Sequence, residues 1–460
     1  MAKTKIPFSK GERVILEIVD LNHAGEGVGR FNGFTVFVPW TVPGDRVDAE
    51  IISLQKNYAR ALSRFLINPS PHRLEPPCPE HGLCGGCRLQ HIQYSEQLHH
   101  KQQLVAGALK RLGGIDVPVQ PTIGMTEPWQ YRNKGQYPVG EAEGKLKIGF
   151  FQQRSHALVD VRRCSIQHPA ADRTVAVARE IITELGIPIY NEKKHRGILR
   201  HLITRTSFSH GEVLLVLVTN GRALPSGDRL IKQLVEGVKD LVGIVQNMNA
   251  RRGNVIAGAE NLLLWGRDYV VEELGGLTFH ISAGSFFQVN PHQAEVLFNL
   301  VRDYADLTGG ETVLDLYCGS GAISLFLSSK AARVIGLESY APAVEDAKKN
   351  AKLNGITNVE FHAGRAEEVM PALAKQGING DVVVVDPPRK GCDEKLLDTL
   401  AAMQPPRIIY VSCNPATLAR DLRYLTRTEP GYYPVIVQPI DLFPQTSHVE
   451  TVVCLNRKKQ

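Results

Sequence analysis

From about residue 290 onward the chain alternates short apolar runs with helical stretches, and this alternation restricts the fold more than any other feature. Short apolar runs of this kind are typical of strands that are buried on both faces. Strands that alternate with helices predict a doubly wound α/β domain. Ligands of such domains bind beyond the carboxyl ends of the strands. The predicted strands are 313–316, 333–337, 359–362, 382–385 and 408–411.

A glycine turn follows the first of these strands. Residues Asp315 to Gly321 follow the pattern D-x-x-x-G-x-G, in which the glycines permit a tight turn and close approach of a cofactor to the backbone. The next strand ends in Glu338, about 20 residues further on, where a carboxylate can accept hydrogen bonds from ribose hydroxyls. The turn lacks the dinucleotide pattern G-x-G-x-x-G and is similar to an S-adenosylmethionine site.

The strand 382–385 is followed by Asp386-Pro387-Pro388-Arg389. Methyltransferases that act on exocyclic amines commonly have an aromatic residue after the two prolines, which stacks on the base. Arg389 occupies that position here, so methylation of an amine is disfavoured and a different chemistry is needed. The alternative is a structural turn that happens to contain two prolines.

Cys413 comes just after the strand 408–411 and is a candidate nucleophile. C5 of uracil is a poor nucleophile, but addition of a thiolate to C6 makes it a carbon nucleophile that can accept a methyl group. A base must then remove the C5 proton, and Glu450 in the last strand-like segment is the best candidate. We expect Arg389 or Lys390 to lower the pKa of the Cys413 thiol. The alternatives are an inert buried thiol and an ordinary carboxylate at the rim of the sheet.

Three cysteines lie close together in the spacing Cys78-x5-Cys84-x2-Cys87, and Cys164 lies far downstream. Four thiolates can hold a [4Fe-4S] cluster or a structural zinc ion. A close triplet with a distant fourth ligand favours the iron-sulfur cluster over zinc, which more often has two pairs of ligands.

Residues 10–66 contain five short strand patterns separated by glycine turns. They predict a small OB-like barrel, which is a common scaffold for binding nucleic acid. Lysine and arginine exceed aspartate and glutamate by 7 in residues 1–300, whereas residues 301–460 have a net charge of −1. The positive front half suits contact with a polyanion. A barrel without RNA contacts and a solvated basic surface are the alternatives.

With 460 residues the chain is expected to form about three domains. A helix is predicted at about 95–112, ending at Gly113-Gly114, and residues 115–280 show a mixture of strand and helix patterns. No apolar run is long enough to span a bilayer, and the start of the chain has no apolar segment typical of a secretory signal. We therefore expect a cytoplasmic protein that does not bind a membrane.

These motifs together resemble the TRAM-domain family of RNA uracil-5-methyltransferases, particularly the bacterial 23S rRNA enzymes. The resemblance covers nearly the whole chain. It includes residues 23–29 in the barrel, Tyr131-Arg132-Asn133-Lys134, and the sequence Gly-Ser-Phe-Phe-Gln-Val-Asn at 284–290. It continues through the cofactor turn, Asp-Pro-Pro-Arg, Ser-Cys-Asn-Pro around Cys413 and His-Val-Glu-Thr around Glu450.

The resemblance implies a role for each matching position. Cys413 is implied as the nucleophile and Glu450 as the proton acceptor. S-adenosylmethionine is implied to bind Gln288, Tyr317, Glu338 and Asp386, and the ligands of a [4Fe-4S] cluster are implied to be Cys78, Cys84, Cys87 and Cys164. Many relatives carry an acidic or amide residue toward the adenine after residues 361–364. Arg365 stands there in this chain, so Glu367 or the backbone would have to replace that contact.

The implied fold is α/β, with a Rossmann-like methyltransferase domain, an N-terminal OB-like TRAM barrel and a mixed α/β central domain that holds the cluster. The predicted boundaries are 1–67, 68–280 and 281–460, and the helix at 95–113 is expected to pack on the catalytic domain.

The implied reaction is methylation of C5 of a specific uridine in 23S rRNA, unassembled or partly assembled. Bacterial relatives dedicated to tRNA generally lack the barrel and the cysteine cluster, so the T-loop uridine of tRNA is the second choice. A third hypothesis is an RNA-binding protein without turnover. No obligate protein partner is implied.

Overall fold

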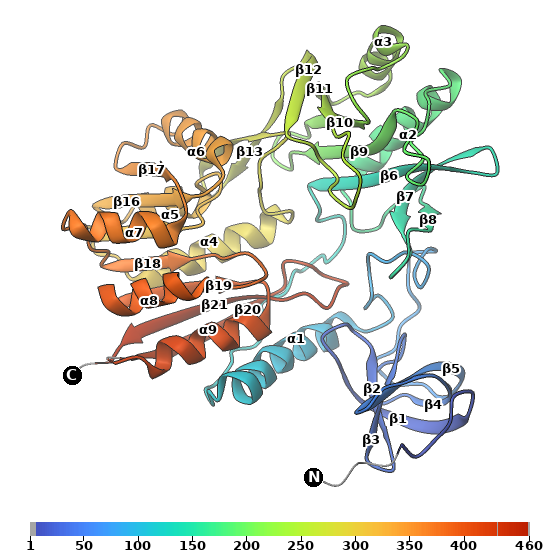
Figure 1. Cartoon of the computed structure of the whole chain (residues 1–460), viewed down its shortest axis with the longest axis horizontal. Helices are drawn as coiled ribbons and strands as arrows, with labels where there is room; N and C mark the ends of the chain where they lie inside the picture. The colour runs from blue at the N-terminus through green and yellow to red at the C-terminus, as the bar shows by residue number, and fades with distance from the viewer. Residues whose placement is uncertain (1–5, 430, 459–460) are drawn as a thin grey trace.

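The computed structural model describes residues 6–429 and 431–458, and it is built around a closed barrel and two seven-stranded sheets (Figure 1). The five-stranded barrel expected near the N-terminus is confirmed, with the strand order β1-β2-β3-β5-β4. Alternate residues of the first strand, Val14, Leu16 and Ile18, face its core, as expected when one face of each strand lines the interior. The strands are β1 (Arg13–Leu21), β2 (Gly27–Phe31), β3 (Phe34–Val38), β4 (Arg46–Leu54) and β5 (Tyr58–Asn68).

The central sheet has the order β12-β11-β10-β9-β6-β7-β8. Every residue of β10 is buried. Val213, Leu215 and Leu217 pack under the helices α2 (Pro169–Glu184) and α3 (Gly227–Gly237), whereas the alternate residues join the core of the C-terminal part. The central and C-terminal parts therefore share a hydrophobic core. The strands are β6 (Lys134–Ala142), β7 (Lys145–Phe151), β8 (Leu158–Asp160), β9 (Leu199–Thr206), β10 (Val213–Thr219), β11 (Leu241–Met248) and β12 (Glu260–Gly266).

The C-terminal sheet has the order β17-β16-β15-β18-β19-β21-β20, in which β15 to β19 are parallel and β21 runs antiparallel to its neighbours. The α/β prediction for this region is confirmed. The strands are β15 (Thr312–Leu316), β16 (Arg333–Glu338), β17 (Val359–Ala363), β18 (Val382–Val385), β19 (Arg407–Ser412), β20 (Tyr432–Ile440) and β21 (Glu450–Arg457).

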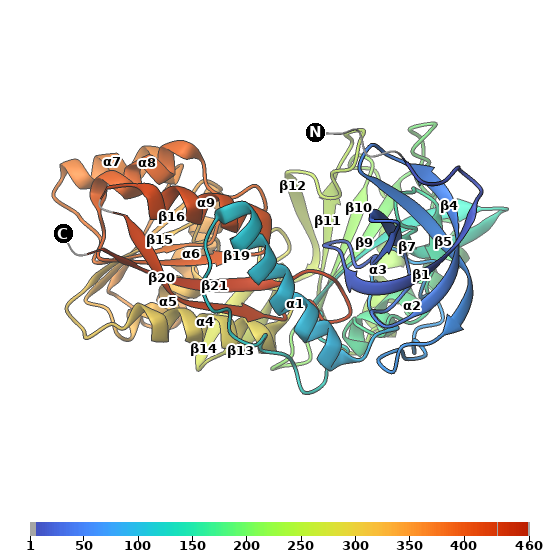
Figure 2. The same cartoon turned by 90° about the horizontal axis from the view of Figure 1, so that it is seen from below.

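Helices cover both faces of this sheet, as Figure 2 shows from below. One core contains α4, α5 and α6 together with the hairpin of β13 and β14, and the other contains α7, α8 and α9. These elements are β13 (Tyr269–Leu274), β14 (Leu277–Ser282), α4 (Pro291–Ala305), α5 (Ala322–Ser328), α6 (Ala341–Leu353), α7 (Ala366–Lys375), α8 (Glu394–Met403) and α9 (Pro415–Arg427).

A helix from the N-terminal half of the chain lies against the C-terminal sheet. Helix α1 (Tyr94–Ala108) continues into the π-helical turn η1 (Leu109–Gly113), and both pack beside α9 (Figures 1 and 2). Gly114 ends the turn in the left-handed conformation with φ of 67°. Helix α1 and the turn η1, which follow the barrel in the chain, thus pack with the C-terminal sheet and its helix α9.

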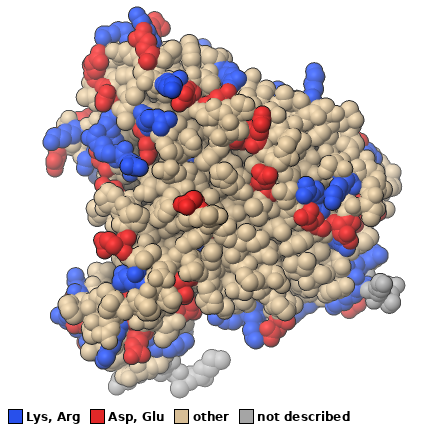
Figure 3. Space-filling model, turned by 180° about the vertical axis from the view of Figure 1, so that it is seen from behind, with Lys and Arg blue, Asp and Glu red and all other residues tan. Residues whose placement is uncertain are grey.

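Figure 3 shows charged side chains of both signs mainly at the periphery of one face, with few over its centre. Among the residues that the structure describes, none of the helices is long and apolar enough to cross a bilayer.

Candidate active site

The predicted site residues at strand ends lie along one edge of the C-terminal sheet. Parallel strands β15, β16, β18 and β19 all end at this edge, and β21 begins there because it is antiparallel. Ser412 pairs with Thr451, so the residue after Ser412 and the residue before Thr451 are neighbours in the register. The residues placed at the edge in this way are Tyr317, Glu338, Asp386, Cys413 and Glu450.

The glycine turn after β15 leaves open space at the sheet edge. Tyr317 and Gly319 have φ of 65° and 56°, and a Cβ built on Gly319 would have no atom within 4 Å. The space beside Gly321, with φ of 84°, is by contrast filled, because a Cβ there would come within 3.0 Å of Ala347. The turn therefore needs glycine for conformation and packing at one end, and keeps its other end free for a ligand.

Glu338 is held firmly at the edge. Its Oε2 accepts a hydrogen bond from the Gly319 N–H at 3.2 Å, and its Oε1 accepts one from the Tyr340 N–H at 2.7 Å. The carboxylate is half-buried and therefore partly available to a hydroxyl group of a ligand. This geometry suits the ribose contact expected from the sequence.

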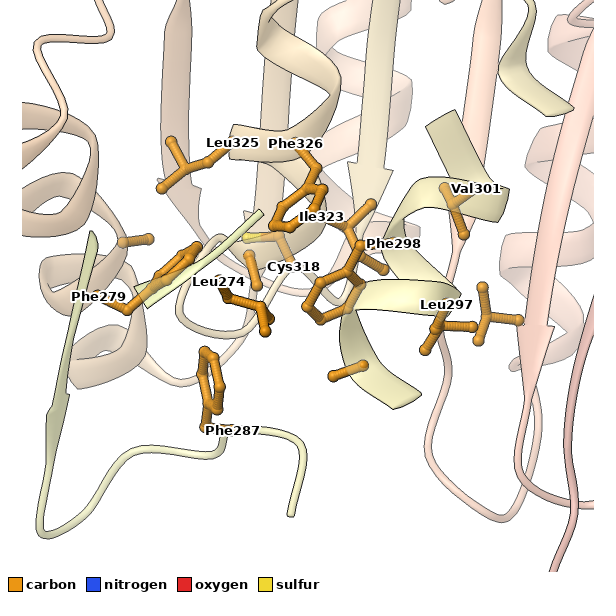
Figure 4. Packing of buried hydrophobic residues seen from close by; sticks show 14 of the residues in the cluster. Leu274, Phe279, Phe287, Leu297, Phe298, Val301, Cys318, Ile323, Leu325 and Phe326 are labelled. Atoms are coloured by element: carbon orange, nitrogen blue, oxygen red, sulfur yellow. The ribbon is translucent and has the colours of Figure 1, made fainter. Parts of the chain in front are cut away.

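Gln288 is buried in the loop between β14 and α4. Phe287 anchors this loop, because its ring packs 5.5 Å from that of Phe279 in the hydrophobic core (Figure 4). The carbonyl oxygen of Gln288 accepts a hydrogen bond from Asn133 Nδ2 at 3.1 Å. The carbonyl of Phe286 accepts one from Ser320 Oγ at 3.3 Å, so the loop borders the cofactor turn. Family resemblance alone pointed to Gln288.

Cys413, Asp386 and Glu450 influence one another electrostatically. Burial, followed by the charges of Glu450 and Asp386, raises the pKa of the Cys413 thiol to about 11, and Arg389 only partly opposes this. Arg389 lowers this pKa as expected, but the net shift is upward, so the expectation of a depressed thiol pKa is wrong. Desolvation and two neighbouring carboxylates outweigh one exposed guanidinium.

The two carboxylates are themselves unusual. Burial raises the pKa of Asp386 to about 7. The pKa of Glu450, which is 3% exposed, lies well above its ordinary value because of burial and then the charge of Asp386, with Arg389 opposing. Each of the two carboxyl groups therefore holds its proton to a higher pH than an ordinary carboxyl group, a property common among acid–base residues of active sites.

A buried polar network fixes the segment 441–449, which leads into β21. Lys101 Nζ from α1 donates to Asp441 Oδ1 at 2.5 Å, and both side chains are fully buried. The Tyr131 hydroxyl donates to the carbonyl oxygen of Pro444 at 3.0 Å. Side chains from α1 and from the start of the central region thus set the path by which β21 enters the edge. Sequence reasoning did not identify this network.

The sequence matches the models of two known protein families. A model of the tRNA (uracil-5-)-methyltransferase family matches residues 93–458, and a TRAM domain model matches residues 7–62. The chain belongs to the tRNA (uracil-5-)-methyltransferase family. It is an RNA methyltransferase, and the recognition of the family from its motifs is confirmed.

Known proteins resemble this methyltransferase over its full length. Uncharacterized RNA methyltransferases of Halalkalibacterium halodurans and Clostridium tetani are both 48% identical to it, over 100% and 98% of each chain. The crystal structure of the Pyrococcus abyssi tRNA (uracil-54, C5)-methyltransferase in complex with S-adenosyl-L-homocysteine has a TM-score of 0.75 at 28% identity. This match covers 96% of the chain described here and 100% of the other.

The four cysteines of the methyltransferase lie near one another without forming a closed site. In addition to burial, the charge of Cys78 raises the pKa of Cys84 and Cys87, and the charge of Cys87 raises the pKa of Cys164. Burial raises the pKa of Cys87 and of Cys164 to about 12. Within residues 6–429 and 431–458, however, no three His, Cys, Asp or Glu side chains are grouped closely enough to hold a metal ion.

Arg365 of the methyltransferase is engaged with a neighbour. It is the N-cap residue of α7, and its Nε donates to Glu367 Oε1 at 2.7 Å. Glu367, the side chain expected to replace the adenine contact, is therefore engaged in an ion pair with Arg365.

Proposed function

We propose that this RNA uracil-5-methyltransferase acts through a covalent bond between Cys413 and C6 of the target uracil. The main support is the register of β19 and β21, which makes Cys413 and Glu450 neighbours at the ligand-binding edge of the sheet. Asp386 ends the adjacent parallel strand. A nucleophile and a buried acid–base group thus lie where a flipped base could enter.

The reaction begins when the Cys413 sulfur bonds to C6 of the uracil, while its proton leaves to water at the half-exposed thiol. C5 gains the electron pair of the C5–C6 double bond and bonds to the methyl group, whose bond to the sulfonium sulfur breaks so that a neutral thioether leaves. Glu450 then removes the C5 proton, the double bond re-forms, and the S–C6 bond breaks. When bound, S-adenosylmethionine supplies an electrophilic methyl group on a positively charged sulfur, a charge that favours ionised carboxylates nearby.

The residues proposed to hold the cofactor surround the open turn after β15. Glu338 would accept hydrogen bonds from the ribose, and Tyr317 would line the turn. Gln288 and Asp386 would meet the cofactor from the neighbouring loop and strand. The free space beside Gly319 supports this arrangement.

Cys78, Cys84, Cys87 and Cys164 are proposed to hold a [4Fe-4S] cluster. Four thiols in one neighbourhood suit iron-sulfur chemistry. Burial raises the pKa of the Cys87 and Cys164 thiols, so binding of the cluster would have to release their protons. The proposed role is structural, because methyl transfer moves no electrons to or from the cluster.

The proposed substrate is 23S rRNA, and tRNA is the second candidate. The barrel and the cysteine cluster, which bacterial relatives dedicated to tRNA generally lack, support the ribosomal substrate. The match to the tRNA enzyme of Pyrococcus abyssi supports the alternative. This match covers 96% of the chain, so it includes the N-terminal barrel. The barrel by itself therefore does not separate the two substrates.

The test is incubation with S-adenosylmethionine and either 23S rRNA or tRNA containing 5-fluorouridine. Fluorine at C5 cannot be removed as a proton, so a covalent protein–RNA complex should accumulate with the true substrate. Cys413→Ala should form none, whereas Cys454→Ala, a buried cysteine of β21 away from the edge, should behave as the wild type. A wild-type protein that methylates RNA without trapping it, or a Cys413→Ala protein that still traps it, would refute the covalent mechanism.

A further inference from the structure

A cavity of about 570 Å³ lies where the segment before Tyr131 meets the amino-terminal ends of α2 and α4, apart from the active site. Its size is within the range of small-ligand pockets. The cysteine nucleophile, its proposed base and the proposed cofactor residues are not among the residues that line it. Those that do include Trp129, Gln130, His168, Phe208, His292 and Gln293.

Aromatic rings form much of the wall. The Phe208 ring lies edge-on between two imidazoles, with centroids 4.7 Å from His168 and 5.2 Å from His292. The backbone N–H of Phe208 donates to Glu272 Oε2 at 2.9 Å, which fixes the position of the ring. Trp129 adds a half-buried indole. Rings brought together from separate elements offer flat surfaces suited to a nucleic-acid base.

Two side chains of the cavity, Gln293 and Glu127, offer acceptor oxygens, alongside donors such as the Trp129 indole N–H. Gln293 is 2% exposed, and its Nε2 donates to the Ile123 carbonyl at 3.4 Å. None of the hydrogen bonds among the described residues uses its Oε1. Glu127 adds a carboxylate, and the lining contains neither lysine nor arginine. A phosphate would therefore lack a cationic partner, whereas an exocyclic amino group would find acceptors.

The cavity is connected to the active site through one short stretch of chain. Tyr131 lines the cavity, and two residues later the N–H of Asn133 donates to the Val289 carbonyl at 2.8 Å, next to Gln288. Gln293 follows in the first turns of α4. A ligand in the cavity would therefore be held at a fixed position relative to the catalytic edge.

We propose that this cavity binds a second, unpaired base of the RNA substrate, one that carries an exocyclic amino group. The base stacks on the Trp129 and Phe208 walls while its amino group donates to Gln293 or Glu127. The proposal rests on the proposed function in that RNA is the substrate. It adds a specificity site that distinguishes adenine, cytosine or guanine from a further uracil.

Fluorescence of Trp129 tests the binding directly. The chain has three tryptophans, so Trp40→Phe with Trp265→Phe leaves Trp129 alone. Short oligoadenylate should quench this protein saturably, and oligouridylate should bind about tenfold more weakly, the order of one stacking or base-specific contact. The matched control combines Trp40→Phe with Trp129→Phe, so that it retains only Trp265 of β12. Its fluorescence should show no saturable quenching. Equal affinity for both oligonucleotides, or no quenching of Trp129, would overturn the proposal.

Steady-state kinetics with the full RNA provide the second test. Phe208→Leu and His292→Ala should each raise KM for RNA about tenfold with kcat unchanged. Tyr433→Ala, an exposed aromatic of β20 outside this cavity, should change neither. His292 is exposed, so its loss should not unfold the protein. Unchanged KM in both variants would refute the proposal. A wild type that fails to form a covalent adduct would instead contradict the proposed mechanism, and the fluorescence result would still stand.

Discussion

The sheet edge proposed to be catalytic and the four-cysteine region differ in how their side chains are held. At the edge, strand pairing places Cys413 next to Glu450, and buried polar contacts fix the segment that precedes β21. Around Cys78 to Cys87 the chain consists mainly of turns and isolated bridges, and the thiols come near one another without closing into a site. Regular hydrogen bonding can preform a site, whereas a loop-built site depends on its ligand.

The strongest test of the preformed edge is Glu450→Gln. Loss of the proposed base should reduce kcat by about 10²- to 10⁴-fold, because a general base contributes about this much. The adduct on ordinary uridine should accumulate, since its C5 proton is no longer removed. Denaturing gels and single-turnover methyl transfer measure both effects. Wild-type kcat in this variant would mean that another group removes the proton.

The buried network behind the edge should contribute strongly to stability. Lys101→Met leaves the Asp441 carboxylate buried without its partner, so the free energy of unfolding should fall by about 3–5 kcal/mol. Chemical denaturation measures this change. The matched control is Lys110→Met, which breaks the exposed pair with Asp116 and should cost at most about 1 kcal/mol. Similar losses in the two variants would show that burial of the Lys101 pair is unimportant.

Asp315, in the strand β15 that ends at this edge, should make the stability of the folded protein depend on pH. Burial raises the pKa of Asp315, which accepts a hydrogen bond from Ser324 Oγ at 2.6 Å, from 3.8 to about 7. The folded protein therefore binds a proton that the unfolded chain releases, and this contribution to stability is full below about pH 4 and is lost as the pH rises through about 7.

Asp315→Asn should therefore reduce the fall in Tm between pH 5 and pH 8 by a few degrees. Thermal unfolding of the ligand-free protein at several pH values measures the effect. A variant with the pH dependence of the wild type would show that Asp315 is not the group responsible.

The cysteine region should show the smallest effect on catalysis. Cys164→Ser should lower bound iron and increase protease cleavage in the turns around Cys78 to Cys87, while covalent trapping by Cys413 changes little. Iron content and cleavage sites are the measurements, and Cys454→Ser is the control that should retain iron. Full iron occupancy in Cys164→Ser would contradict its assignment as a ligand.

The sheet edge could be predicted from the sequence because each side chain follows a short apolar strand. Tyr317, Glu338, Asp386 and Cys413 all occupy such positions, and parallel strands bring their carboxyl ends to one side. The barrel could also be predicted, because its strands alternate apolar and polar residues and are separated by glycine turns. Local patterns of this kind determine which residues share a surface.

Long-range contacts and desolvation could not be predicted in this way. Lys101 and Asp441 are 340 residues apart, and a lysine within a helix gives no sign that it is buried. The direction of the Cys413 pKa shift was also wrong, because the sequence shows the nearby Arg389 but not the burial that dominates. The proposed base-binding cavity depends on Trp129, Phe208 and His292, which no sequence motif links.

The position of β21 between β19 and β20 has a consequence for biosynthesis. A nascent chain that is made from its N-terminus contains Cys413 and the residues of β19 before residues 450–457 have been made. Of the described strands, β21 is synthesised last, yet it is an inner strand and carries Glu450. The growing polypeptide therefore has its proposed nucleophile but not its proposed base, and we expect it to become competent for turnover only when the final strand inserts.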